Sequence, residues 1–368
     1  MHKYKLVILL ICLITCFLVL IFRFLTPVKI GVILSVDTAT GYEENLAIHF
    51  WRNKFPRIGL RPVLLVVETP KLGENEFKES YERLVKKGVS VIVGGALSVE
   101  GVILAKLSER YDVPTFGITT ATTLLNGRKD NYYRLMTPAD IEAIYTSIYL
   151  SELGIKRLLI IVSKYNKEFS QTYADHLKER MGTCDIVFSR NELVLKKLAS
   201  FKPDGVFMIL PSAQVSILSK IIRNFDEGIK LFSSPWGRTL TFKDLWTPSL
   251  NGLEYITIDT PNFIKYGDLA KEFEKTYSIP AGIGTGYAFS TMGIVYEAIE
   301  KVGTERKKLI EYFNTPRIYD TTYGKVYMDE YGDPVMDSLY ILRIENGEVV
   351  QIGRRLVDEF YKKSEKER

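Results

Sequence analysis

The chain has 368 residues, enough for about two domains, and its 46% hydrophobic and 25% charged residues are typical of a globular protein. The net charge of +5 is small, and no basic segment is interleaved with aromatic residues, which argues against nucleic-acid binding. Because two of the three cysteines lie in the N-terminal apolar stretch and only three histidines are present, we expect no internal disulfide, metal site or other cofactor.

Residues 1–27 form a targeting segment. Lys3 and Lys5 precede the apolar run from Leu6 to Phe22, which ends at Arg23. The run is longer than the core of a typical signal peptide, and no A-x-A-like cleavage site follows it. An uncleaved signal anchor is the first choice and a cleaved signal peptide the second. Lysines on the amino side predict that the rest of the chain lies outside the cytoplasm.

From Val28 onward, predicted strands alternate with predicted helices. The strands are expected at 28–34, 62–68, 89–93, 113–117, 157–163, 205–210 and 230–233. The helices are expected at 42–55, 74–87, 139–153, 167–181, 212–225 and 286–303, and a further helix begins with Ser98 as its N-cap. This alternation predicts an α/β fold of two doubly wound parallel sheets, the second starting near residue 139.

The C-terminal part has a different character. Residues 324–329 and 339–344 read as antiparallel strands, with turn-forming residues after the second. Residues 357–368 form a charged tail that we expect to be mobile.

Two neighbouring strands of the first sheet end in turns rich in small and hydroxylated residues. Ser98 follows the strand 89–93, and Thr120, Ala121 and Thr122 follow the strand 113–117. In a parallel α/β sheet, ligands bind outside the carboxyl ends of the strands, where backbone N–H groups can hold a carboxylate. Each residue alone could be only a cap or loop residue, but the pair of turns together favours a site.

The order of several motifs resembles a known family. KIGVIL, SVIVGGALS, VPTFGITTATT, NYYRLMTPAD and GTGYAFSTMGIVYEAIEKVG occur in sequence between Val28 and Gly353. In that span the chain resembles type I periplasmic binding proteins, in the branch of the branched-chain amino-acid (Leu/Ile/Val) receptors of ABC transporters. The resemblance implies two lobes that close on a ligand through a hinge of three crossovers. Lobe 1 would contain 28–138 and 261–318, and lobe 2 would contain 139–260 and 319–356.

The resemblance also implies site residues. Ser98 matches a serine that binds the carboxylate, Thr120 matches a position that offers backbone groups, and Thr122 matches the threonine of an Ala-Thr pair. Phe169 stands where the family has a tyrosine. Trp236 and Gly237 lie near the turn that carries an acidic residue for the ammonium group in amino-acid receptors, and no Asp or Glu stands there.

Further candidates are Tyr42 or Glu43 from the first loop, Ser212 after a strand of the second sheet, and Tyr287 near the hinge. Against these readings, Tyr287 could lie in the core, Trp236 could cover a sheet edge, and Glu43 could be an acid of a first helical turn.

Three functions are compatible with the chain. The first is a non-enzymatic receptor that captures a small polar ligand, an amino acid or a related carboxylate or amide, and presents it to an ABC-type permease. The second is a membrane-tethered sensor or scaffold module with the same fold. The third is an extracytoplasmic hydrolase, which is disfavoured because G-x-S-x-G is absent and His49 and His176 lie in predicted helices without a nucleophile nearby.

Overall fold

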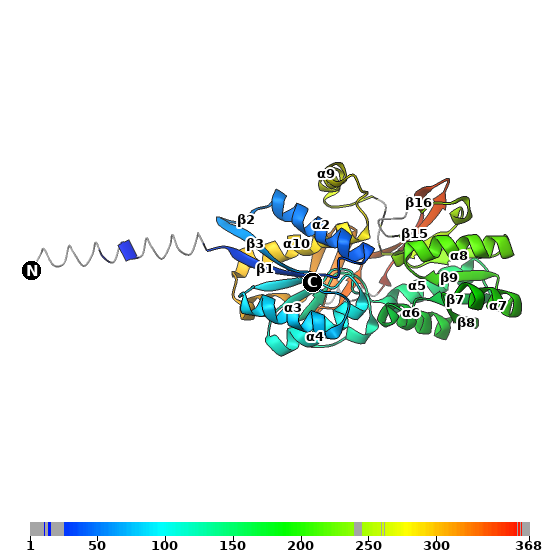
Figure 1. Ribbon diagram of the computed structural model, residues 1–368, viewed down its shortest axis with the longest axis horizontal. Helices are drawn as coiled ribbons and strands as arrows, with labels where there is room; N and C mark the ends of the chain where they lie inside the picture. The colour runs from blue at the N-terminus through cyan, green and yellow to red at the C-terminus, as the bar shows by residue number, and fades with distance from the viewer. Residues whose placement is uncertain are drawn as a thin grey trace, which may run out of the picture.

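The computed structural model describes residues 26–238, 245–258, 260, 262–358, 360 and 362, together with positions 11, 14 and 15. Two helix-covered sheets lie side by side along the longest axis of the molecule (Figure 1). The first sheet has the order β2-β3-β1-β4-β5-β6 and is parallel except for the pair β2–β3. Its strands are β1 (Val28–Ile33), β2 (Arg57–Ile58), β3 (Arg61–Glu68), β4 (Val91–Gly94), β5 (Thr115–Gly117) and β6 (Tyr132–Arg134).

Helices cover both faces of the first sheet because its central strand carries apolar residues on both faces. Val28, Ile30 and Val32 of β1 share a core with α2 (Ala39–Lys54) and α10 (Ile283–Val302). Ile33 belongs to the opposite core, with α3 (Glu74–Lys86) and α4 (Ser98–Tyr111). In Figure 1, α2 and α10 lie above the strands and α3 and α4 below them. The period of two along a buried strand explains this arrangement.

The second sheet has the order β16-β15-β11-β10-β9-β7-β8. Its strands are β7 (Arg157–Val162), β8 (Thr183–Phe188), β9 (Gly205–Ile209), β10 (Lys230–Ser233), β11 (Glu254–Thr257), β15 (Ser338–Glu345) and β16 (Glu348–Leu356). The strands from β7 to β11 pair in parallel, whereas β15 and β16 are antiparallel. Its helices are α5 (Ala139–Glu152), α6 (Lys167–Arg180), α7 (Asn191–Phe201) and α8 (Ser212–Phe225).

The chain runs between the two sheets three times. It leaves the first sheet after β6 and, after β11, forms α9 (Gly267–Tyr277), α10 and α11 (Arg306–Phe313), of which α10 packs on the first sheet. It then re-enters the second sheet at β15. A small sheet of β12 (Arg317–Thr321), β13 (Gly324–Met328) and β14 (Pro334–Met336) lies on the last of these paths. The buried side chain of Arg134 forms an ion pair with Asp333, which joins the first path to the last.

The structure confirms the predicted alternation of strands and helices. It adds a strand and a helix within residues 183–201 and corrects the expectations for Ser98 and for the tail. Ser98 is not an N-cap, because Leu97 holds that position and Ser98 is the first residue of α4. The start of the predicted tail is packed on the fold, because Val357 and Phe360 are buried in the main core and the N–H of Asp358 donates to Tyr145 Oη.

The predicted targeting segment, 1–27, lies almost entirely outside the described residues. In the part of the chain that the structure describes, no helix has the length and apolar character needed to cross a membrane.

Candidate functional site

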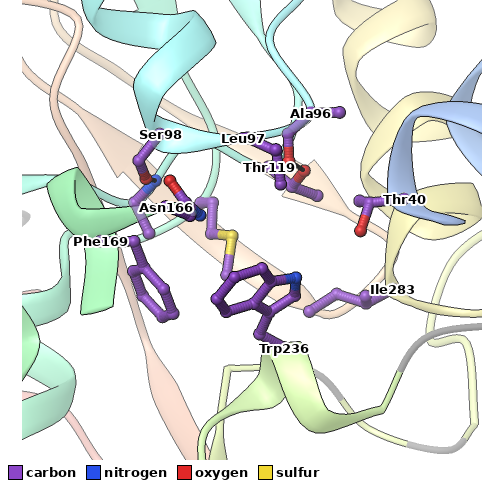
Figure 2. Close-up of a pocket in the computed structure, with 11 residues that line it drawn as sticks. Thr40, Ala96, Leu97, Ser98, Thr119, Asn166, Phe169, Trp236 and Ile283 are labelled. Atoms are coloured by element: carbon purple, nitrogen blue, oxygen red, sulfur yellow. Dashed lines mark hydrogen bonds between the residues drawn. The ribbon is translucent and has the colours of Figure 1, made fainter. Parts of the chain in front are cut away.

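A cavity lies between the two sheets, at the carboxyl ends of their strands (Figure 2). About 390 Å³ inside it is free of protein atoms when the open solvent at its mouth is included, and about 30 Å³ of this is accessible to the centre of a water molecule. The first sheet and its helices contribute Thr40, Ala96, Leu97, Ser98, Thr119, Ala121, Met136 and Ile283, and the second contributes Asn166, Phe169 and Trp236. The position agrees with the general rule for ligand sites in open α/β sheets.

Four of the residues proposed from the sequence line this cavity together: Ser98, Ala121, Phe169 and Trp236. The hydroxyl oxygen of Ser98 accepts a hydrogen bond from the N–H of Ala121 at 3.2 Å, so the two turns of the first sheet are joined. The rings of Phe169 and Trp236 meet edge to face with their centres 6.1 Å apart. Hydroxyl and aromatic groups therefore face each other across one space. Ligand binding by these residues stays a prediction.

Two threonines of the same turn lie behind the wall. The hydroxyl of Thr120 donates to the carbonyl of Gly95 at 3.0 Å and lies 2.8 Å from Tyr132 Oη. The hydroxyl of Thr122 accepts from the N–H of Leu124, and its carbonyl accepts from Arg134. Both side chains are fully buried, so they stabilise the loops that carry Ala121.

The remaining sequence candidates do not line the cavity. Ser212 is the first residue of α8 and is buried, and Gly237 is buried next to Trp236. A side chain at Gly237 would meet Ser233 Oγ at 2.3 Å, which explains the glycine. Tyr42 is 49% exposed on α2, whereas Tyr287 belongs to the main core, with its hydroxyl 3.3 Å from Met336 Sδ.

Asn166 is the main residue that the sequence reasoning missed. It precedes α6 at the N-cap position, yet its side chain makes no capping bond to that helix. Its Oδ1 instead accepts from the N–H of Val99 in the first turn of α4, at 3.3 Å. Asn166 therefore connects the two sides of the cavity. The sequence feature that could have identified Asn166 is its position after β7, which matches the position of Ser98 after β4.

Two buried carboxyl groups lie directly behind the wall of the cavity. Thr119 Oγ1 lies 2.5 Å from Glu44 Oε1 and 2.9 Å from the carbonyl oxygen of Ala96. Glu100 Oε2 accepts from the N–H of Ala96 at 2.9 Å. Burial raises the pKa of Glu44 well above its usual range and that of Glu100 to about 7.

Glu43, a sequence candidate for ligand contact, binds the start of α10 instead. Its Oε1 accepts from the N–H of Gly282 at 2.9 Å and from the N–H and hydroxyl of Thr285, both at 2.8 Å. Burial raises the pKa of Glu43, and these hydrogen bonds and the charge of Arg238 act in the opposite direction. Within the described residues, no group of three or more acidic, histidine or cysteine side chains could hold a metal ion.

No model of a protein family matches the chain, and no curated protein sequence matches it. Solved structures of solute-binding proteins do match. A leucine binding protein, LivK, of Thermotoga maritima has a TM-score of 0.80 at 20% identity, covering 90% of this chain and 99% of its own. A solute binding protein of an ABC transporter from Rhodopseudomonas palustris, in complex with 3,4-dihydroxybenzoic acid, has a TM-score of 0.79 at 17% identity. The match covers 89% of this chain and 97% of that protein.

The branched-chain amino acid transporter substrate binding protein LivJ of Streptococcus pneumoniae, in complex with isoleucine, matches with a TM-score of 0.77 at 15% identity. It covers 90% of this chain and 99% of its own. The chain thus has the fold of the periplasmic binding proteins of ABC transporters, and the resemblance inferred from sequence motifs is confirmed at the level of fold.

Proposed function

We propose that this chain is an extracytoplasmic solute-binding protein that captures a small polar ligand, an amino acid or a related carboxylate or amide, between its two halves. The observation that carries the proposal is the cavity itself, because its wall is shared by turns at the strand ends of both sheets. The protein would bind its ligand without turnover and pass it to an ABC-type permease in the membrane.

The two halves would act as hinged lobes. Lobe 1 would contain 28–138 and 261–318, and lobe 2 would contain 139–260 and 319–356, so that three chain crossings form the hinge. Closure of such a hinge around a ligand is a motion of the μs–ms range. Residues 1–27 would anchor the protein as an uncleaved membrane helix or direct its export as a cleaved signal, and either outcome leaves the binding halves outside the cytoplasm.

A thermal-shift screen of the full-length protein in mild detergent against amino acids, carboxylates, amides and sugars tests this function. A bound ligand stabilises the native state by RT ln(1 + [L]/Kd), about 2.7 kcal/mol at a hundredfold excess over Kd. Ser98→Ala should reduce the shift, whereas Ser212→Ala, a buried serine outside the cavity, should not. Absence of any saturable shift, or equal shifts in the two variants, would contradict the proposal.

A further inference from the structure

We propose that the cavity selects apolar carboxylic acids that lack an α-ammonium group, and that Asn166 determines this selection. The inference rests on the proposed function and deepens it to a substrate class. Three observations support it. One amide has a fixed orientation, hydrogen-bond donors line the cavity, and the nearby carboxyl groups are bonded to other protein groups.

The orientation of the Asn166 amide follows from its partner. The backbone N–H of Val99 can only donate, so the atom 3.3 Å from it must be the side-chain oxygen of Asn166. The NH₂ group then points away from Val99, and Asn166 lines the cavity. In Figure 2 the amide lies beside Ser98 and Phe169, at one end of the space. Asn166 therefore offers the cavity hydrogen-bond donors.

The neighbouring polar groups are donors as well. Ser98 Oγ already accepts from Ala121, which leaves its own hydrogen for another acceptor. The Trp236 indole carries a donor only, and its ring lies between Phe169 and Ile283 in Figure 2. Hydrogen-bond donors in the wall of one cavity suit a ligand with a carboxylate or a carbonyl oxygen.

Among the residues that the structure describes, no carboxylate lines the cavity, and Glu44, behind its wall, is already in contact with Thr119. The Thr119 hydroxyl has one hydrogen but two short oxygen contacts, to Glu44 Oε1 and to the carbonyl of Ala96. Glu44 thus contacts the hydroxyl of Thr119, is fully buried and does not line the cavity. Burial raises its pKa well above the usual range.

The two other nearby acids do not line the cavity either. Glu43 is bound to the start of α10 by three hydrogen bonds, and Glu100 accepts from the N–H of Ala96. An ammonium group in this space would lose water without gaining a counter-charge from the described lining residues, which costs several kcal/mol. The rest of the wall is apolar and suits a hydrocarbon or aromatic body: Leu97, Met136, Phe169, Trp236 and Ile283.

The test compares ligands that differ only in the ammonium group. Calorimetry on the full-length protein would measure 4-methylpentanoate against L-leucine and 3-phenylpropanoate against L-phenylalanine. We expect each acid to bind at least about tenfold more tightly than its amino acid, equivalent to about 1.4 kcal/mol. Binding of an amino acid as tightly as its partner acid would overturn the inference and leave the proposed function intact.

Asn166→Asp tests the assigned residue. Aspartate keeps an oxygen for the N–H of Val99 but replaces the NH₂ donors by a negative charge. The ratio of affinities for the acid and the amino acid should fall at least tenfold or reverse, whereas loss of folding would reduce the affinity for both ligands equally. Asn191→Asp, the same change at an exposed position of the same half, should leave the ratio unchanged.

An unchanged ratio in Asn166→Asp would overturn the role of Asn166. If neither pair binds while the thermal-shift screen finds another ligand, the substrate class is wrong. If no compound binds at all, the proposed function itself fails.

Discussion

Glu100 is a carboxyl group whose burial makes the stability of the fold depend on pH. It has no exposed surface, and only one of its oxygens has a hydrogen-bond partner within the part of the chain that the structure describes. Burial raises its pKa from 4.5 to about 7. Between these two values the unfolded chain releases the proton and the folded chain keeps it. Rising pH therefore favours the unfolded state until Glu100 ionises in the fold as well.

Replacement of Glu100 by Gln should flatten this part of the stability profile. The difference between 4.5 and about 7 corresponds to about 3 kcal/mol of stability lost as the pH rises through that window. We expect the free energy of unfolding, measured in urea, to change between pH 4 and pH 8 by about 3 kcal/mol less in Glu100→Gln than in the parent protein. The exposed Glu79→Gln serves as the control. Parallel profiles for the parent and Glu100→Gln would show that the carboxyl is already ionised in the fold.

The elements of the fold were largely predictable, and the exceptions have physical reasons. The strands β1, β4, β7 and β9 are short, buried apolar runs, which a parallel sheet requires. The strand β8 was missed because it lies at the sheet edge, where its side chains are mostly part-exposed and no apolar run marks it. Its helix, α7, was missed with it.

The site was predictable only in part, because sequence marks strand ends but not contacts between them. Ser98 and Ala121 follow buried strands, and the cavity includes both. Asn166 contacts Val99, which lies 67 positions away in the sequence, and no local sequence pattern predicts that bond. Thr120 and Thr122 were placed in the correct turn, but alternate side chains of an irregular loop face opposite directions, so theirs lie behind the wall.

The start of α10 depends on a carboxylate from another helix. The N-cap of α10 is Gly282, which has no side chain to bind the free N–H groups of the first turn. Glu43 of α2 supplies these bonds through Oε1, which places its carboxyl group at the positive end of the helix dipole. The helix pair that forms one wall of the site is thereby fixed at its cavity end, since Thr40 and Ile283 both line the cavity.

Glu43→Ala should destabilise the fold by about 2–4 kcal/mol, because it leaves buried N–H groups without partners. Glu43→Gln retains the accepting oxygen and should cost much less. Thermal unfolding and amide hydrogen exchange over 282–290 would measure the difference between the two variants. Equal losses in Ala and Gln would mean that the charge, and not the hydrogen bonds, stabilises this helix end.

At the scale of the whole molecule, Asn166 connects the two halves across the cavity, so it should favour the arrangement in which they are close. Asn166→Ala removes the acceptor of the Val99 N–H while leaving each sheet and its core untouched. The loss of one hydrogen bond, about 1 kcal/mol, shifts an equilibrium between open and closed forms about fivefold towards the open form. Small-angle X-ray scattering of the unliganded protein should therefore give a larger radius of gyration for Asn166→Ala than for the parent, with Asn191→Ala as the matched control. Because a ligand in the cavity restores contacts between the halves, saturating ligand should bring the variant back to the parent dimension. A variant that keeps the parent radius in both states would show that the halves are held together by the three chain crossings and their packing, independently of this bond.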